Sequence, residues 1–213
     1  MPDPRIASRR LYGFIDPTYL GKRDATDVAC AMIEGGVDMI QVRAKELTHP
    51  QRVKLSLIVV GVASQHNVPV IINDDIDAAF EAGADGVHLG QEDWAAIPRA
   101  TRVKRLASMR IVGISTHSLE QALAAERDGA DYIGVGPIFA TATKPGVKPV
   151  GVGLIQQVRE RVATPFFAIG GITQENVAQV LEAGAMRIAV VSAILSAPDV
   201  AAAARAFKAR LTG

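Results

Sequence analysis

Two acidic residues follow two short apolar runs in the middle of the chain, and their types suit metal chemistry. Residues 70–72 are followed by Asp74, and Gly86–Leu89 is followed within a few residues by Asp93. Both runs predict buried strands and the stretch between them predicts a helix, so the strands are parallel and their carboxyl ends share one rim. Two carboxylates there suit Mg²⁺, which binds oxygen and keeps waters and substrate phosphates. The alternative is that both acids only cap helices or end strands.

Cationic residues follow another apolar run, Met39–Val42, at alternate positions. Gln41 lies within this run, and Arg43 and Lys45 come directly after it. Alternate positions of an extended segment share one side. An amide beside two cations suits a polyanion such as pyrophosphate, because a guanidinium can bind two oxygens at once. A solvated strand end would explain the same pattern without a ligand.

A third group of polar residues lies in residues 140–149, directly after a strand that we predict to end with residues 134–139. The stretch carries the hydroxyls of Thr141 and Thr143 and two lysines, Lys144 included, among glycine and prolines. Loops of this length without secondary structure often act as lids over active sites. The alternative is a disordered connector.

A quasi-repeat predicts the elements that position these residues. Gly-x-Asp precedes a strand at Asp38, Asp85 and Asp131, and a degraded fourth copy has Met186 in place of Asp. The spacings of 47, 46 and 55 residues each hold two β-α units of roughly 25 to 30 residues. Four periods therefore hold eight units, which predicts an α/β fold, the (β/α)₈ TIM barrel; a doubly wound open sheet explains the count less well. The remaining predicted strands are Leu11–Ile15, 70–72, 111–114 and Phe166–Ile169.

In such barrels the active site lies at the carboxyl ends of the strands, so polar residues there are candidates for the site. Ser115 ends the fifth strand and could hydrogen-bond a ligand amine, whereas His88, inside the fourth, fits a satisfied barrel residue better than a base. Gly170 and Gly171 end the seventh strand, and we predict that the eighth strand ends with residues 189–193. Glycines let the backbone approach an anion, and barrels often bind phosphate with the loops after these two strands.

Composition limits the class of protein. The chain has 213 residues, of which 49% are hydrophobic, and predicts one soluble domain over residues 1–213 with residues 1–10 as a short N-terminal extension. A net charge of +1 gives no reason to expect nucleic acid or a membrane as a partner. The single cysteine, Cys30, is expected in the core and permits no internal disulfide, which fits a reducing compartment. No apolar signal segment follows the basic N-terminus, so we expect a cytoplasmic protein.

These residues together resemble a known family. From Leu11 to Phe207 the chain resembles the thiamine phosphate synthases, which join hydroxymethylpyrimidine pyrophosphate to thiazole phosphate and release pyrophosphate. The motifs that carry the resemblance are Gln41-x-Arg43-x-Lys45, Asn73-Asp74, Gly90-Gln91-Glu92-Asp93, Gly113-Ile114-Ser115, Gly136-Pro137-Ile138-Phe139, Thr141-x-Thr143-Lys144 and Ile169-Gly170-Gly171-Ile172.

The resemblance implies a role for most of the polar residues. It implies that Asp74 and Asp93 hold Mg²⁺ and that Ser115 contacts the pyrimidine. The residues expected to bind the pyrimidine pyrophosphate are Gln41, Arg43, Lys45, Asn73 and Lys144. Those expected to hold the thiazole phosphate are Thr141, Ala142, Thr143, Gly171, Val191 and Ser192. Those expected to act in catalysis are Arg43, Lys45, Lys144 and Ser115.

Two positions depart from the family pattern. Ile15 stands where the family usually has Thr before the Asp of strand one, and Met186-Arg187 replaces the usual Asp-Gly before strand eight. The second departure could alter the entry into strand eight. It should matter less for Val191 and Ser192 if they contact phosphate through backbone groups.

The residue types favour a displacement without a covalent enzyme intermediate, because no Ser-His-Asp or Cys-His arrangement is evident in the sequence. Mg²⁺ and the cationic side chains would neutralise the departing pyrophosphate. An electron-rich aminopyrimidine would stabilise the resulting carbocation, and the thiazole nitrogen would then attack it.

Three rivals remain open. A thiazole tautomerase of the same barrel family needs neither a metal pair nor a pyrophosphate site. A phosphate-binding sugar isomerase or epimerase would share the Gly170-Gly171 site, and a non-catalytic protein could sense a thiamine precursor. The expected partners are two small-molecule substrates, with a homo-oligomer left open.

Overall fold

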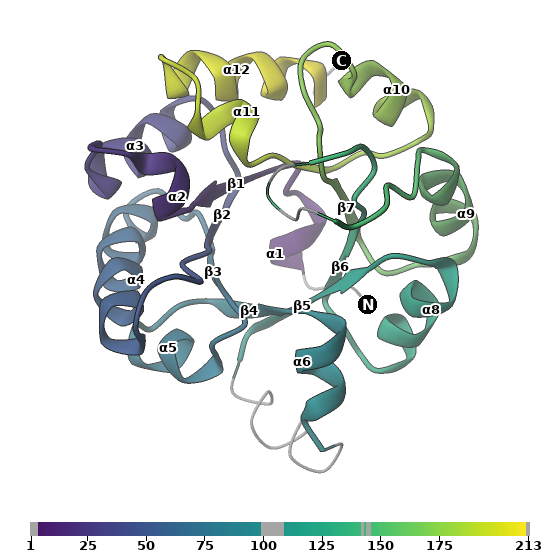
Figure 1. Ribbon diagram of the computed structural model, residues 1–213, viewed down its shortest axis with the longest axis horizontal. Helices are drawn as coiled ribbons and strands as arrows, with labels where there is room; N and C mark the ends of the chain where they lie inside the picture. Colours follow the sequence, from purple (N-terminus) through teal and green to yellow (C-terminus); the bar gives the residue numbers. More distant parts are fainter. Residues whose placement is uncertain (1–3, 99–108, 142, 144–145, 212–213) are drawn as a thin grey trace.

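The computed structural model describes residues 4–98, 109–141, 143 and 146–211, and they form a closed barrel. Eight parallel strands pair in chain order and the last pairs with the first, as Figure 1 shows along the barrel axis. This arrangement confirms the predicted (β/α)₈ TIM barrel. The strands are β1 (Leu11–Ile15), β2 (Met39–Val42), β3 (Val70–Asn73), β4 (Gly86–Leu89), β5 (Ile111–Thr116), β6 (Tyr132–Val135), β7 (Phe166–Ile169) and β8 (Ile188–Ala189).

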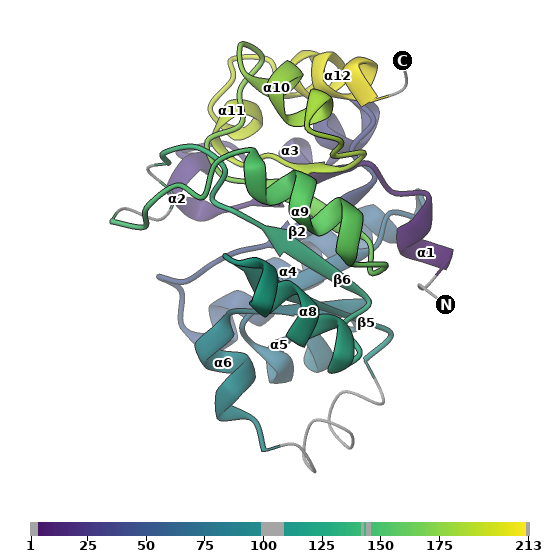
Figure 2. The same ribbon diagram turned by 90° about the vertical axis from the view of Figure 1, so that its right-hand side faces the viewer.

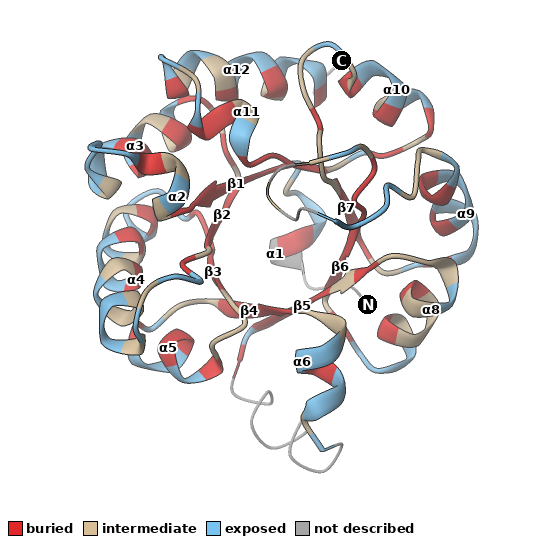
Figure 3. Ribbon diagram, in the orientation of Figure 1, coloured by how far each residue is buried: buried red, intermediate tan, exposed pale blue. Residues whose placement is uncertain are grey.

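Apart from α1, the helices of the described residues lie outside the strands and surround them (Figure 1). Figure 3 shows the strands and the inward faces of the helices as buried, while the outward faces are exposed. The helices are α1 (Pro4–Ala7), α2 (Pro17–Leu20), α3 (Ala25–Glu34), α4 (His49–Ser64), α5 (Ile76–Glu81), α6 (Gln91–Ala96), α8 (Leu119–Arg127), α9 (Gly153–Arg161), α10 (Val177–Glu182), α11 (Ser192–Leu195) and α12 (Val200–Leu211).

The amino-terminal segment packs against one end of the barrel. Ile6 on α1 is completely buried in the hydrophobic core. Figure 2 places α1 at the opposite end of the barrel from α2 and the loop after β6. The carboxyl ends of the strands, which carry the predicted site residues, therefore face away from α1.

The aspartates of the quasi-repeat fasten the beginning of one strand to the beginning of the next. Each carboxylate accepts a backbone N–H from the preceding strand, so it helps to set the register of a strand pair. The bonds run to Asp38 from Arg10 and Leu11 at 2.9 Å each, to Asp85 from Val70 at 3.0 Å, and to Asp131 from Val112 at 2.7 Å.

The fourth copy lacks this carboxylate, and its strand is short. Met186 is 59% exposed, and the guanidinium of Arg187 donates to the carbonyl of Ala7 at 2.8 Å. Burial, with a smaller contribution from the nearby charge of Arg10, lowers the pKa of Arg187. Strand β8 nevertheless enters the barrel, because the Ile188 N–H donates to the Arg10 carbonyl at 2.9 Å.

Two strands are shorter than the sequence predicts, and one core assignment is wrong. Strand β6 ends at Val135 and does not continue to residue 139, since Pro137 has no N–H to continue a ladder. Strand β8 ends at Ala189, and the chain then enters the short helix α11. Cys30 is exposed on α3 rather than buried in the core.

Candidate active site

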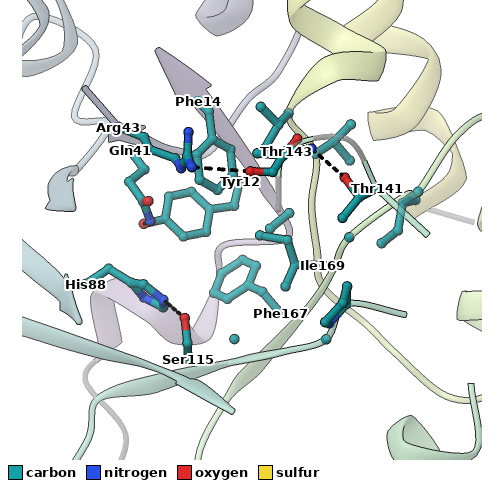
Figure 4. A pocket seen from close by; sticks show the side chains of 18 of the residues that line it. Tyr12, Phe14, Gln41, Arg43, His88, Ser115, Thr141, Thr143, Phe167 and Ile169 are labelled. Atoms are coloured by element: carbon teal, nitrogen blue, oxygen red, sulfur yellow. Dashed lines mark hydrogen bonds between the residues drawn. The ribbon is translucent and has the colours of Figure 1, made fainter. Parts of the chain in front are cut away.

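A cavity opens at the carboxyl ends of the strands. Water-sized molecules can occupy about 90 Å³ of it. In Figure 4, Gln41 and His88 lie on one side of the cavity and Thr141 on the other. The structure thus brings together nine of the predicted site residues, namely Gln41, Arg43, Asn73, Ser115, Thr141, Thr143, Gly171, Val191 and Ser192.

Arg43 is held at the mouth of this cavity by a carboxylate that the sequence analysis did not assign to the site. Its guanidinium pairs with Asp16 at 2.5 Å and also donates to the Thr143 carbonyl at 3.3 Å. Asp16 is almost fully buried, and its second oxygen accepts the Thr18 N–H at 3.0 Å, which caps α2. Asp16 therefore fixes both a helix and a guanidinium. The available signal was its position directly after β1.

Lys45 lies apart from Gln41 and Arg43, in a hollow beside the cavity. Its ammonium pairs with Asp74 at 3.1 Å, and Asn73 donates its amide to the same carboxylate at 2.6 Å. Asn73 lines both the hollow and the cavity, so the two spaces adjoin. Strand β2 ends at Val42 and Lys45 lies in a turn, and this is why alternation does not keep all three predicted residues on one wall.

Asp74 and Asp93 are neighbours, although Asp93 does not end a strand. Asp93 lies in the first turn of α6, and Asp74 has a φ of +63°, a conformation that non-glycine residues seldom adopt. Partial burial, then the charge of Asp74, raises the pKa of Asp93. Among the described residues no cluster of three or more His, Cys, Asp or Glu side chains could hold a metal. The two facing carboxylates nevertheless fit a divalent cation, because a cation would relieve their mutual repulsion.

His88 is hydrogen-bonded on both ring nitrogens within the barrel. Nδ1 lies 3.0 Å from the hydroxyl of Tyr132, and Nε2 lies 2.9 Å from the hydroxyl of Ser115. Tyr132 also bonds Tyr12 at 2.9 Å, and Tyr12 accepts the side-chain N–H of Gln41 at 2.7 Å. Burial raises the pKa of both tyrosines, so both keep their hydrogens. The two tyrosines were not predicted as site residues, because each lies inside an apolar run.

The glycines after β7 are required by the neighbouring loop. Gly171 has a φ of +66°, and a side chain there would begin 2.4 Å from the Ala140 carbonyl oxygen and 2.8 Å from the Phe139 Cβ. Asn176 donates its amide to the Gly171 carbonyl at 2.8 Å. A substitution at Gly171 would thus displace the loop after β6 whether or not an anion binds beside it.

Two predicted residues, Ala142 and Lys144, lie outside the described residues, so their expected roles stay predictions. The chain is anchored on either side of them, since the Phe139 N–H donates to the Gly170 carbonyl at 3.0 Å and the Val150 N–H donates to the Pro137 carbonyl at 2.8 Å.

In the described part of the chain, no helix is both long and apolar enough to span a membrane.

The fold and the cavity define a barrel enzyme whose chemistry takes place at the carboxyl ends of its strands. Residues 11–194 match the family profile described as thiamine monophosphate synthase. The chain belongs to this family of transferases of thiamine biosynthesis, as its sequence predicts.

Individual relatives agree with this assignment. The chain is 44% identical over 205 residues to a thiamine-phosphate synthase of Chloroflexus aurantiacus, covering 96% of this chain and 93% of that protein. It is 43% identical over 203 residues to the thiamine-phosphate synthase of Shouchella clausii, covering 95% and 96%. Thiamine phosphate pyrophosphorylase from Pyrococcus furiosus has a similar structure, with a TM-score of 0.86, 30% identity, and coverage of 99% and 98%.

Proposed function

We propose that the protein condenses hydroxymethylpyrimidine pyrophosphate with thiazole phosphate to give thiamine phosphate and pyrophosphate. The C–O bond between the pyrimidine methylene and pyrophosphate breaks with its electron pair on oxygen. The thiazole ring nitrogen then forms the new C–N bond to the same methylene carbon. The observation that carries the proposal is the placement of Asn73, which joins a cavity suited to a flat ring with a hollow that holds Lys45 and Asp74.

The pyrophosphate is proposed to lie across the boundary between cavity and hollow. Arg43 would meet it from the cavity side and Lys45 from the hollow. Asp16 supports this role because it holds the guanidinium of Arg43 in place before any ligand arrives. Positioned cations stabilise the negative charge that grows on the leaving oxygen at little cost in reorganisation.

Asp74 and Asp93 are the residues that would hold Mg²⁺. When bound, the ion would neutralise part of the pyrophosphate charge and so make it a better leaving group. Lys45, which pairs with Asp74 at 3.1 Å, would then be released toward the phosphates. The nearness of Asp74, which after partial burial is the next cause of the raised pKa of Asp93, supports this assignment, because two neighbouring carboxylates favour a shared cation.

The thiazole phosphate is proposed to lie on the other wall, between Thr141, Thr143, Gly171 and the turn at Val191 and Ser192. Backbone N–H groups and the hydroxyl of Ser192 are suitable donors to a phosphate. Phe14 and Ile169 also line the cavity and would give the thiazole ring an apolar surface. This wall lies opposite Gln41, so the two substrates would meet in the middle.

Incubation of the pure protein with both substrates, with and without Mg²⁺, tests the proposal. We expect thiamine phosphate and pyrophosphate in equal amounts, and only when Mg²⁺ is present. A thiazole tautomerase would isomerise its substrate without metal or pyrimidine. A sugar-phosphate isomerase would act on neither substrate, and a sensing protein would bind a precursor without turnover.

A further inference from the structure

Five side chains form one continuous row of hydrogen bonds across the interior of the barrel. The row, here called the barrel relay, runs from Gln41 through Tyr12, Tyr132 and His88 to Ser115. Its four bonds measure 2.7, 2.9, 3.0 and 2.9 Å, and its two ends lie in the wall of the cavity. The barrel relay thus joins two residues that the resemblance to the thiamine phosphate synthases assigns to the pyrimidine substrate.

One end of the barrel relay sets the direction of all its hydrogen bonds. The side-chain nitrogen of Gln41 can only donate, so Tyr12 accepts there. Among the described residues Tyr132 is the other hydrogen-bond partner of the Tyr12 hydroxyl, so the one hydrogen of Tyr12 goes to Tyr132. Tyr132 in turn gives its one hydrogen to the next neighbour, Nδ1 of His88. A neutral imidazole that accepts at Nδ1 carries its hydrogen on Nε2, and that hydrogen goes to Ser115.

The hydroxyl of Ser115 therefore accepts from His88, and its own hydrogen is left for another acceptor. Ser115 is partly exposed in the cavity wall, where a ligand can reach it. Were the direction reversed, Ser115 would donate to His88 and could only accept from a ligand. The direction of the barrel relay thus decides which kind of ligand atom Ser115 recognises.

The geometry points to a positioning role for Tyr12, Tyr132 and His88: together they hold His88 as the Nε2–H tautomer and present Ser115 as a hydrogen-bond donor to an aromatic ring nitrogen of the substrate. This inference rests on the proposed function for the identity of that substrate. It also refines the expectation that Ser115 meets an amine, because the atom that requires its hydrogen is an acceptor. Tyr12 and Tyr132 suit the role because both rings are fully buried and packed edge to face at 5.9 Å between centroids.

The tautomer can be measured directly in the ligand-free, unmodified protein. Protein labelled with ¹⁵N-histidine would be examined at about pH 8.5, where an ordinary imidazole is neutral. The His88 signals would be assigned by their loss in His88→Gln. We expect a protonated Nε2 and a bare Nδ1. A protonated Nδ1 would mean that the row runs in the opposite direction, and would overturn the inference.

Two matched variants test whether the tautomer matters for binding. Tyr132→Phe and Tyr12→Phe each remove one hydroxyl from neighbouring, equally buried rings. Tyr132→Phe removes the donor to His88 Nδ1, so Ser115 is no longer fixed as a donor. We expect the Kd of the pyrimidine pyrophosphate, measured by calorimetry, to rise by about three- to tenfold. Tyr12→Phe removes the hydroxyl that turns the Tyr132 hydrogen toward His88, and it also removes the acceptor of the Gln41 side-chain N–H.

The decisive comparison repeats both variants in a Ser115→Ala background. There Tyr132→Phe should change the Kd by less than about twofold, because the group it positions is already gone. Tyr12→Phe should lose only part of its effect, because its action through Gln41 remains. A full effect of Tyr132→Phe in both backgrounds would show a merely structural role and refute the inference. If the unmodified protein does not bind the pyrimidine pyrophosphate, the proposed substrate is wrong, and the tautomer measurement still decides the direction of the barrel relay.

Discussion

Replacement of Asp16 by Asn separates the two tasks that this residue performs. Asn keeps an oxygen that can accept the Thr18 N–H, so the cap of α2 survives. Its amide nitrogen, however, would face the guanidinium of Arg43 across the present 2.5 Å contact, and two donors cannot bond each other. The variant therefore breaks the ion pair while leaving the helix cap in place.

The expected loss of stability follows from the burial of the pair. Removing one partner of a buried ion pair costs about 3 to 5 kcal/mol. The side chain of Asp16 is 2% exposed and that of Arg43 is 16% exposed, so some solvent can reach the guanidinium that remains. We therefore expect the free energy of unfolding of Asp16→Asn to fall by about 2 to 3 kcal/mol. Urea unfolding followed by circular dichroism would measure it.

Catalysis should fall as well, because Arg43 loses the group that holds it. We expect kcat/KM for the pyrimidine pyrophosphate to fall by about tenfold and KM for the thiazole phosphate to change little. Asp24→Asn is the matched control, since Asp24 caps α3 through the Thr26 N–H at 2.7 Å and is exposed. If both variants unfolded at the same urea concentration and kept full activity, the ion pair would position nothing and the reasoning would be wrong.

Three further predictions concern the metal pair, the quasi-repeat and the rim. Asp93→Ala should lower kcat by at least about tenfold at limiting Mg²⁺ with an unchanged circular dichroism spectrum, and unchanged turnover would reject the metal site. Asp85→Ala should lower the free energy of unfolding by about 1 to 2 kcal/mol, whereas Met186→Ala, at the same place in the fourth copy, should not; equal losses would contradict the fastening role of the carboxylate. Hydrogen bonds, first that to Asp75, raise the pKa of His49, so its contribution to stability is complete below the unfolded pKa of about 6.5 and disappears as pH rises through the higher folded value. Urea unfolding should therefore show that His49→Ala destabilises more at about pH 5.5 than at about pH 9, and a difference independent of pH would refute the ion pair.

The barrel was predictable because each signal for it is local in the sequence. Glycine ends a helix, an aspartate follows within two residues, and an apolar run begins, so a short window contains the whole pattern. The structure adds the reason for the aspartate, which fastens a neighbouring strand, as Asp85 does for Val70. The prediction of where a strand ends fails where this local signal is absent. Pro137 ends the ladder of β6, whose last residue is Val135, and the chain enters helix α11 shortly after β8.

The rim residues were predictable from the same rule, since polar residues directly after parallel strands meet at one end of a barrel. Asp16 and the tyrosines were not, because their roles depend on partners far away in the chain. Asp16 meets Arg43 27 positions later, and Tyr12 meets Tyr132 120 positions later. A tyrosine in an apolar run looks like core, and in this barrel both tyrosines are indeed core residues.

His88 is a core residue and a positioning residue at the same time. A histidine in an apolar strand was expected to be satisfied by hydrogen bonds, and both of its ring nitrogens are. The partner that satisfies Nε2 is Ser115, which lines the cavity, so the bonds that stabilise the buried imidazole also orient a hydroxyl toward the ligand. In a barrel whose interior leads directly to its active site, packing the core and positioning the substrate are done by the same side chains.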